Sequence, residues 1–186
     1  MSPPVATTVP ATALVTGPPR SGKSTVLERT VDRLRADGWE VGGITAPEIR
    51  DDGDRVGFEI DAVGREGRAT MAHVEYDGDP RVGKYGVDVD AIDRLTGVLE
   101  SSIDDPAIDC VVIDEIAPMQ LESERFRTAT TRALDAPKPT LAAVADGSSG
   151  TLGAVKSRSD VAAFTVAPET RDELPDRLVE RVREWA

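Results

Sequence analysis

The stretch Gly17-Pro18-Pro19-Arg20-Ser21-Gly22-Lys23-Ser24, followed by Thr25, decides the fold of this chain. It matches the pattern G-x-x-x-x-G-K-[ST], in which a glycine-rich turn joins a strand to a helix and binds phosphates through its amides. The apolar run at residues 13–16 predicts a buried strand before it, and Leu27, Val31 and Leu34 follow it at helical spacing. We therefore expect a phosphate-binding loop between the first strand and the first helix.

The residues of this loop have distinct expected roles. Backbone amides and the positive end of the helix dipole are directed at the phosphates, and Lys23 reaches the β- and γ-phosphates as a compact charge. Ser24 supplies a hydroxyl to Mg²⁺, and Thr25 is a candidate contact for the α-phosphate. Pro18 and Pro19 have no N–H, so the amides of residues 20–25 carry the binding, and the Arg20 side chain is a further candidate. The alternative is a glycine turn before a surface helix.

A second motif is Cys110-Val111-Val112-Ile113-Asp114-Glu115, an apolar strand that ends in two acids. An aspartate delivered by such a strand can hold Mg²⁺ through its water shell, so Asp114 is the expected metal-site carboxylate. Glu115 is the expected general base that orients the attacking water. The alternative is an acidic strand end that caps the next turn.

The composition limits the class of protein. The chain has 186 residues, a net charge of −12 and 39% hydrophobic residues, which suits one α/β domain at residues 12–186 after a flexible leader at residues 1–11. Lysine occurs only at Lys23, Lys84, Lys138 and Lys156. Such an acidic, lysine-poor surface favours a salt-rich cytosol, where the Debye length falls to about 3 Å. An ordinary acidic protein from a GC-rich genome is the alternative.

Several functions are excluded or disfavoured. The acidity argues against nucleic-acid binding, because a phosphate backbone requires a basic stripe. No apolar run suggests a membrane span and residues 1–10 lack the features of a signal peptide, so we expect a cytoplasmic protein. Cys110 is the single cysteine and is expected to be a buried structural thiol. The chain contains no asparagine, so it lacks the Asn-Lys-x-Asp motif that recognises guanine, and base specificity should be loose or should come from backbone atoms. Nothing in the sequence indicates an oligomeric state.

Between the two motifs the pattern departs from simple strand–helix alternation. The turn at residues 51–54, with alternating apolar positions at 56, 58 and 60, predicts an antiparallel β-hairpin inserted in the α/β core. Residues 83–87 and residues 146–153 are expected to be loops. Asp88 or Asp90 is expected to cap a helix, and Pro175 should lie in the first turns of an amphipathic terminal helix.

Further stretches make the chain resemble the THEP1-type nucleoside-triphosphatases, also called cancer-related nucleoside-triphosphatases. The matching segments are residues 15–25, 43–50, 55–58, 82–87, 112–116, Met119 and 170–172. The Gly-Phe hairpin at residues 57–58 and the loop at residues 82–87 are the discriminating pieces. The resemblance implies a P-loop α/β fold with a mainly parallel sheet flanked by helices. It also implies Mg²⁺-dependent hydrolysis of ATP, GTP and other NTPs, here in a salt-adapted, archaeal-like member.

The chain departs from that family pattern in three places, one of which is the loop at residues 146–153. Ala117-Pro118-Met119-Gln120 replaces the usual Gly-Lys-Met-Glu, so an acid is lost at Gln120. Thr170 replaces the usual asparagine before Arg171, where a nucleobase contact is expected to change.

Charge on the transferring phosphoryl group needs a cation besides Lys23 and Mg²⁺. The candidates are Arg50, Arg55, Lys84, Lys156, Arg158 and Arg171, of which Arg50 and Arg171 are the foremost. Glu48 is a candidate second carboxylate of the site. Two other functions use the same motifs: a small kinase that phosphorylates a nucleoside or an RNA end, and a nucleotide-responsive binding module without turnover.

Overall fold

The computed structural model of the protein describes residues 11–186, so the predicted leader lies outside the described residues except for Ala11. The helices are α1 (Lys23–Ala36), α2 (Val89–Asp104), α3 (Glu124–Asp135), α4 (Gly150–Lys156) and α5 (Leu174–Trp185), with a 3₁₀ turn at Gln120–Glu122. The strands are β1 (Thr12–Thr16), β2 (Val41–Thr45), β3 (Glu48–Asp51), β4 (Asp54–Val63), β5 (Arg68–His73), β6 (Arg81–Val82), β7 (Tyr85–Val87), β8 (Cys110–Ile116), β9 (Thr140–Val144) and β10 (Val161–Thr165).

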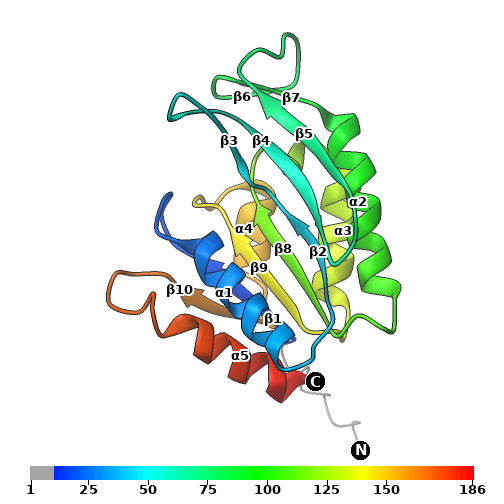
Figure 1. The fold of residues 1–186 in the computed structure, drawn as a ribbon, viewed down its shortest axis with the longest axis vertical. Helices are drawn as coiled ribbons and strands as arrows, with labels where there is room; N and C mark the ends of the chain where they lie inside the picture. The colour runs from blue at the N-terminus through cyan, green and yellow to red at the C-terminus, as the bar shows by residue number, and fades with distance from the viewer. Residues whose placement is uncertain (1–10) are drawn as a thin grey trace, which may run out of the picture.

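One sheet runs through the molecule and has two halves (Figure 1). In the first half, β10, β1, β9, β8 and β2 lie side by side and are all parallel. In the second half, β4 pairs antiparallel with β2, and β5, β7 and β6 continue outward, while β3 pairs with β4 alone. The strand β9 lies between β1 and β8, so the phosphate loop and the acidic strand end are separated by one strand.

Helices cover both faces of the sheet and bury two apolar clusters (Figure 1). On one face, α1 and α5 pack on alternate residues of the parallel strands. Leu27 of α1 and Leu178 of α5 are among the helix residues buried there. On the other face, α2, α3 and α4 cover the remaining alternate residues, with Phe126 fully buried. Strands that are buried on both faces have nearly continuous apolar sequences, and the strands of the parallel half show this pattern. This helix–sheet–helix layering confirms the predicted α/β fold.

The antiparallel half is larger than the predicted hairpin. The hairpin itself is confirmed as β3 and β4 around the turn at residues 51–54, but β5, β6 and β7 extend it into half of the sheet. Residues 83–87 were expected to form a loop, and this expectation is wrong: Val82 pairs with Tyr85, so the segment is the tight hairpin of β6 and β7. Tyr85 is buried there, and its burial stabilises an extended segment whose glycines suggested a loop.

The expected loop at residues 146–153 is correct only to Ser149. Gly150 begins α4, whose Leu152 and Val155 pack into the core, so tertiary burial overrides the low helix propensity of its glycines. The predicted Asp88 cap is confirmed, since its carboxylate accepts a hydrogen bond from the Ala91 amide at 3.0 Å. Pro175 lies in the first turn of α5, as expected. Within residues 11–186, no helix has both the length and the apolarity needed to cross a bilayer.

Candidate active site

The phosphate loop occupies the carboxyl end of β1, where ligands of α/β proteins bind. Gly17 has φ of 150°, a conformation that other residues rarely adopt, and a Cβ there would lie 2.7 Å from Ser21 Oγ and 3.2 Å from the Val166 carbonyl oxygen. Gly22 is the N-cap of α1 with φ of 100°, a left-handed conformation that favours glycine. The loop therefore directs the N-terminus of α1, with its unpaired amides, at whatever lies above it.

Lys23 is the first residue of α1 and is almost fully buried. Its Nζ donates a hydrogen bond to the Gly17 carbonyl at 2.9 Å and lies 4.0 Å from Glu115 Oε2. The contact between Lys23 and Glu115 therefore brings the phosphate loop and the acidic end of β8 together.

Asp114 ends the apolar part of β8 and meets the start of α1. Its Oδ1 accepts a hydrogen bond from Ser24 Oγ at 3.2 Å. Burial raises the pKa of Asp114 to about 6, although the bond from Ser24 lowers it. Burial also raises the pKa of Glu115, and the charge of Lys23 opposes that rise. Burial therefore disfavours the ionised form of both carboxylates, and a nearby positive charge would stabilise that form.

The pair Ser24 and Asp114 fits a magnesium ion. Mg²⁺ prefers hard oxygen ligands, keeps several waters and takes one or two protein oxygens together with substrate phosphates. The hydroxyl and the carboxylate meet these requirements, and burial of the Asp114 carboxylate, which raises its pKa, favours a bound cation beside it. Within residues 11–186 no cluster of three or more His, Cys, Asp or Glu side chains forms an all-protein metal cage.

A cavity of about 750 Å³ lies above these residues and joins the two halves of the sheet. Its floor is the phosphate loop from Pro19 to Thr25 with Asp114 and Glu115. Its other wall comes from the antiparallel half and from the segments that follow β2, β8 and β9. That wall is formed by Ala46, Glu48, Arg55, Phe58, Met71, Val82, Ala117, Pro118, Met119, Gln120 and Ala145.

The positively charged candidates lie in different places. Arg55 lines the main cavity, where it stacks on the Phe58 ring at 5.1 Å and donates to Glu48 at 3.1 Å. Arg50 lines a neighbouring cavity and also holds Glu48, at 2.6 Å. Arg171 does not line the main cavity, but its Cδ would lie 3.1 Å from a Cβ on Gly22, so it packs against the phosphate loop.

Two further candidates, and the single cysteine, have structural roles. Lys156 donates to the carbonyls of Ala145 and Gly147, and Arg158 is paired with Asp135 and Asp160. Cys110 is fully buried, and burial raises the pKa of its thiol to about 12, so it stays protonated as expected of a structural thiol.

Sequence reasoning did not identify most of the residues that the antiparallel half contributes to the cavity. It placed Arg50 ahead of Arg55, although Arg55 is the one that lines the main cavity. Strand alternation gave no signal for this contact, because a period of two places Arg55 and Phe58 on opposite faces of β4, and the contact between them appears only in the folded hairpin. Gln120 also lines the cavity, and its Oε1 is buried without a hydrogen-bond partner among residues 11–186.

The comparisons with known proteins agree with this geometry. The family model described as NTPase matches residues 12–179. The nucleoside-triphosphatase THEP1 of Methanothermobacter thermautotrophicus is 39% identical over 174 residues, covering 92% of this chain and 96% of that protein. The protein of the same name from Methanopyrus kandleri is 39% identical over 179 residues, covering 95% of this chain and 98% of that protein.

Two solved structures share the fold. The solution structure of a human cancer-related nucleoside triphosphatase aligns with a TM-score of 0.78 and 30% identity, covering 92% of this chain and 97% of that one. The crystal structure of THEP1 from Aquifex aeolicus aligns with a TM-score of 0.80 over 92% of this chain and 98% of that one. At 24% identity, the second alignment supports the fold alone.

Proposed function

This chain belongs to the NTPase family, and from that premise we propose that it is an enzyme that hydrolyses nucleoside triphosphates to the diphosphate and phosphate. The observation that carries the proposal is the convergence of Lys23 and Glu115 at 4.0 Å in one cavity, on the phosphate loop. The relatives are named nucleoside-triphosphatases, which does not favour the kinase alternative.

The phosphate loop binds the triphosphate in this proposal. The amides of residues 20–25 and the end of α1 face the phosphates, with Lys23 placed for the β- and γ-phosphates. Ser24 and Asp114 would hold Mg²⁺, Asp114 through water. When bound, the ion neutralises charge on the phosphate oxygens.

Glu115 acts on the nucleophile. A water molecule attacks the γ-phosphorus in line, its oxygen forms the new P–O bond, and the bond to the β-phosphate oxygen breaks. Glu115 takes the proton that the water loses. Burial raises the pKa of Glu115, which makes it a stronger base than an exposed glutamate.

Arg55 is our choice for the additional cation, because it lines the same cavity and is held in place by Phe58, Glu48 and the Tyr85 hydroxyl. Arg171 remains a candidate through its contact with Gly22, and Arg50 through its shared carboxylate, Glu48. We place the activity in the cytoplasm, where nucleoside triphosphates and Mg²⁺ are abundant.

The test is phosphate release from ATP, GTP, CTP and UTP with Mg²⁺, at low and at molar KCl. We expect release of phosphate together with an equal amount of diphosphate for more than one base. The acidic, lysine-poor composition leads us to expect higher activity in molar salt. If no nucleotide yields phosphate under either condition, the proposed hydrolysis is wrong.

A further inference from the structure

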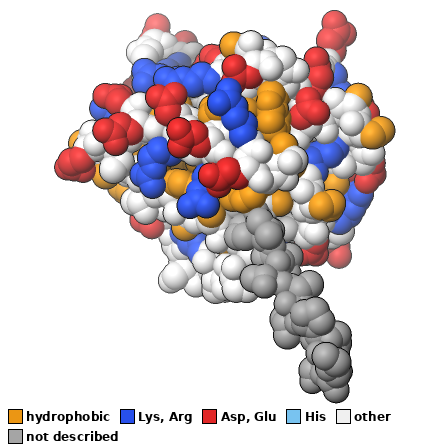
Figure 2. All heavy atoms as spheres, turned by 90° about the horizontal axis from the view of Figure 1, so that it is seen from below, with side chains coloured by type: hydrophobic (Ala, Val, Ile, Leu, Met, Phe, Trp, Pro, Cys, Tyr) orange, Lys and Arg blue, Asp and Glu red, His pale blue; other side chains and the backbone are white. Residues whose placement is uncertain are grey.

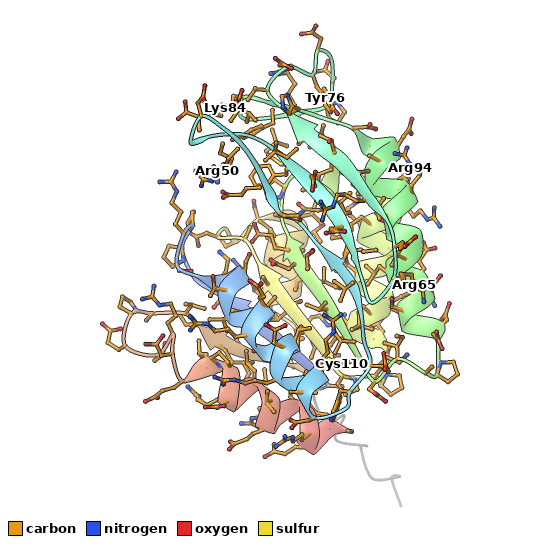
Figure 3. The ribbon with its side chains drawn as sticks, viewed as in Figure 1. Arg50, Arg65, Tyr76, Lys84, Arg94 and Cys110 are labelled. Atoms are coloured by element: carbon orange, nitrogen blue, oxygen red, sulfur yellow. The ribbon has the colours of Figure 1, made fainter. Side chains whose placement is uncertain are left out.

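A second cavity, of about 590 Å³, adjoins the main one and is basic. Four of its lining residues are cations: Arg20 from the phosphate loop, Arg50 and Arg55 from the β3–β4 hairpin, and Lys84 from the β6–β7 turn. Arg20 and Arg55 also line the main cavity, so the two spaces share a wall. Figure 3 shows Arg50 and Lys84 at the end of the antiparallel strands that overhangs the phosphate loop. We call this space the basic cavity.

The charges in the basic cavity do not cancel. Glu48 accepts hydrogen bonds from both Arg50 and Arg55, and Asp54 is the one acidic residue in the lining. Within residues 11–186, Arg20 and Lys84 form no ion pair (the described salt bridges involve other side chains). The lining residues together with Glu48 carry four positive and two negative charges, a surplus of two positive charges, whereas Asp51 and Asp52 lie at the exposed tip of the β3–β4 hairpin, outside the lining.

That surplus contrasts with the rest of the molecule. The chain carries a net charge of −12, and on the face shown in Figure 2 acidic and basic side chains are interspersed. Concentrating like charges in a concave space costs free energy that an anionic ligand offsets, and a cleft lined by one sign of charge focuses its field. A local excess of cations in an acidic chain therefore points to an anion.

Several of the donors are held in fixed positions. Arg55 Nε donates to the Tyr85 hydroxyl at 3.1 Å, and Arg50 Nη1 donates to the Gly53 carbonyl at 2.9 Å. Lys84 Nζ lies 5.4 Å from the centre of the Tyr85 ring. Anchored guanidinium groups lose little entropy on binding, and their fork geometry suits phosphate oxygens. A surplus of two charges matches a phosphate dianion.

We propose that the basic cavity is a second anion subsite, which binds a phosphate dianion beside the nucleotide. The shared chemistry is that of inorganic phosphate and of a phosphomonoester on a small molecule. This inference goes beyond hydrolysis: Arg20 and Arg55 are shared with the main cavity, whereas Arg50 and Lys84 line the basic cavity and not the main one. Glu48 competes with the anion for Arg50 and Arg55.

The first test is calorimetric titration of inorganic phosphate, at low ionic strength, into protein saturated with Mg²⁺ and a non-hydrolysable NTP analogue. We expect saturable binding that weakens at least tenfold in the double variant Arg50→Gln/Lys84→Gln and tightens in Glu48→Gln. Both substituted cations are exposed, so the fold should tolerate the change. The matched control is Arg94→Gln, an exposed arginine on α2 away from the cavity (Figure 3), which should leave the affinity unchanged.

The second test separates this subsite from the nucleotide site. In Lys23→Ala without nucleotide, phosphate binding that still depends on Arg50 and Lys84 supports the subsite even if the chain hydrolyses no nucleotide. Glycerol phosphate is then compared with inorganic phosphate: tighter binding of the ester identifies a phosphorylated organic ligand, and equal binding identifies free phosphate. The proposal is overturned if neither probe binds saturably, or if Arg94→Gln weakens binding as much as the double variant.

Discussion

The carboxylates on the two walls of the main cavity have pKa values that are shifted in opposite directions. On the parallel half, burial raises the pKa of Asp114 to about 6 and also raises that of Glu115. On the antiparallel half, burial raises the pKa of Glu48 as well, but hydrogen bonds from Arg55 and Arg50 outweigh it and the pKa is lowered. The same residue type is thus destabilised as an anion on one wall and stabilised on the other.

This difference separates the carboxylate that is suited to the reaction from the carboxylate that holds other side chains in place. A carboxylate whose pKa is raised toward neutrality can accept a proton, whereas one paired with two guanidinium groups is a weak base. Glu115 is therefore suited to act on water, and Glu48 is suited to hold Arg50 and Arg55 in place. Substitutions on each wall test this difference between the carboxylates.

The largest expected effect comes from the parallel half. Lys23→Ala removes the buried ammonium group at the phosphate loop and should lower kcat/KM by roughly 10³-fold or more, through lost binding and lost charge stabilisation. Nucleotide binding is measured by calorimetry and turnover by phosphate release. Far-ultraviolet circular dichroism checks the fold. A variant that is folded and retains near-normal turnover would remove Lys23 from the site.

The next effect tests the proposed base. Glu115→Gln keeps the shape of the side chain and removes its ability to take a proton, so turnover should fall by about 10²–10⁴-fold while nucleotide binding is retained. Single-turnover phosphate release and equilibrium binding separate the two. Turnover close to that of the unmodified protein would show that another group orients the water.

The sequence predicted the parallel half better than the antiparallel half, for a physical reason. The phosphate loop and the Asp114–Glu115 strand end are local patterns, because glycines, an apolar run and a helical stripe are read over a few residues. The antiparallel half depends on pairing between distant segments, such as β5 with β7, and its glycines suggested a loop where Tyr85 is buried in a strand. Arg55 is held by the hydroxyl of Tyr85, thirty residues away in the sequence, so its place in the cavity could not be predicted from its neighbours along the chain.

A third effect concerns stability and again separates the walls. The pKa of Asp114 rises from 3.8 to about 6 on folding, which corresponds to roughly 3 kcal/mol. An acid with a raised pKa holds its proton more tightly in the folded state, so the free energy of unfolding falls as pH rises from about 4 to about 6 and is then level. Asp114→Asn should remove this fall and be more stable than the unmodified protein at pH 7.

The measurement is urea unfolding of nucleotide-free protein in EDTA across that pH range. Ser24→Ala is the comparison variant: it keeps the carboxylate and removes the hydrogen bond that lowers the pKa of Asp114, so the fall should persist and extend to higher pH. An equal pH dependence in Asp114→Asn and in the unmodified protein would contradict the assigned burial cost.

A smaller catalytic effect is expected from the antiparallel half. Arg55→Ala removes a cation that lines the cavity from the side, so kcat/KM should fall by about 10–100-fold, less than for a donor aimed directly at the developing charge. Arg94→Ala removes one positive charge far from the site and should change kcat/KM by less than about twofold. Equal losses in both variants would mean that only the overall charge matters.

The smallest effect comes from Glu48, the counterpart of Glu115. Its lowered pKa means that its ion pairs stabilise the fold above pH 4.5, the unfolded value, and that this contribution is lost as the pH falls through the lower folded value. Because the Glu48 side chain is 37% exposed, Glu48→Gln should cost at most about 1 kcal/mol at pH 7, and the difference should shrink below pH 4.5. Urea unfolding at pH 7 and pH 3.5 measures both values. Its turnover should fall far less than that of Glu115→Gln, and an equal loss in the two glutamine variants would mean that both walls contribute to proton transfer.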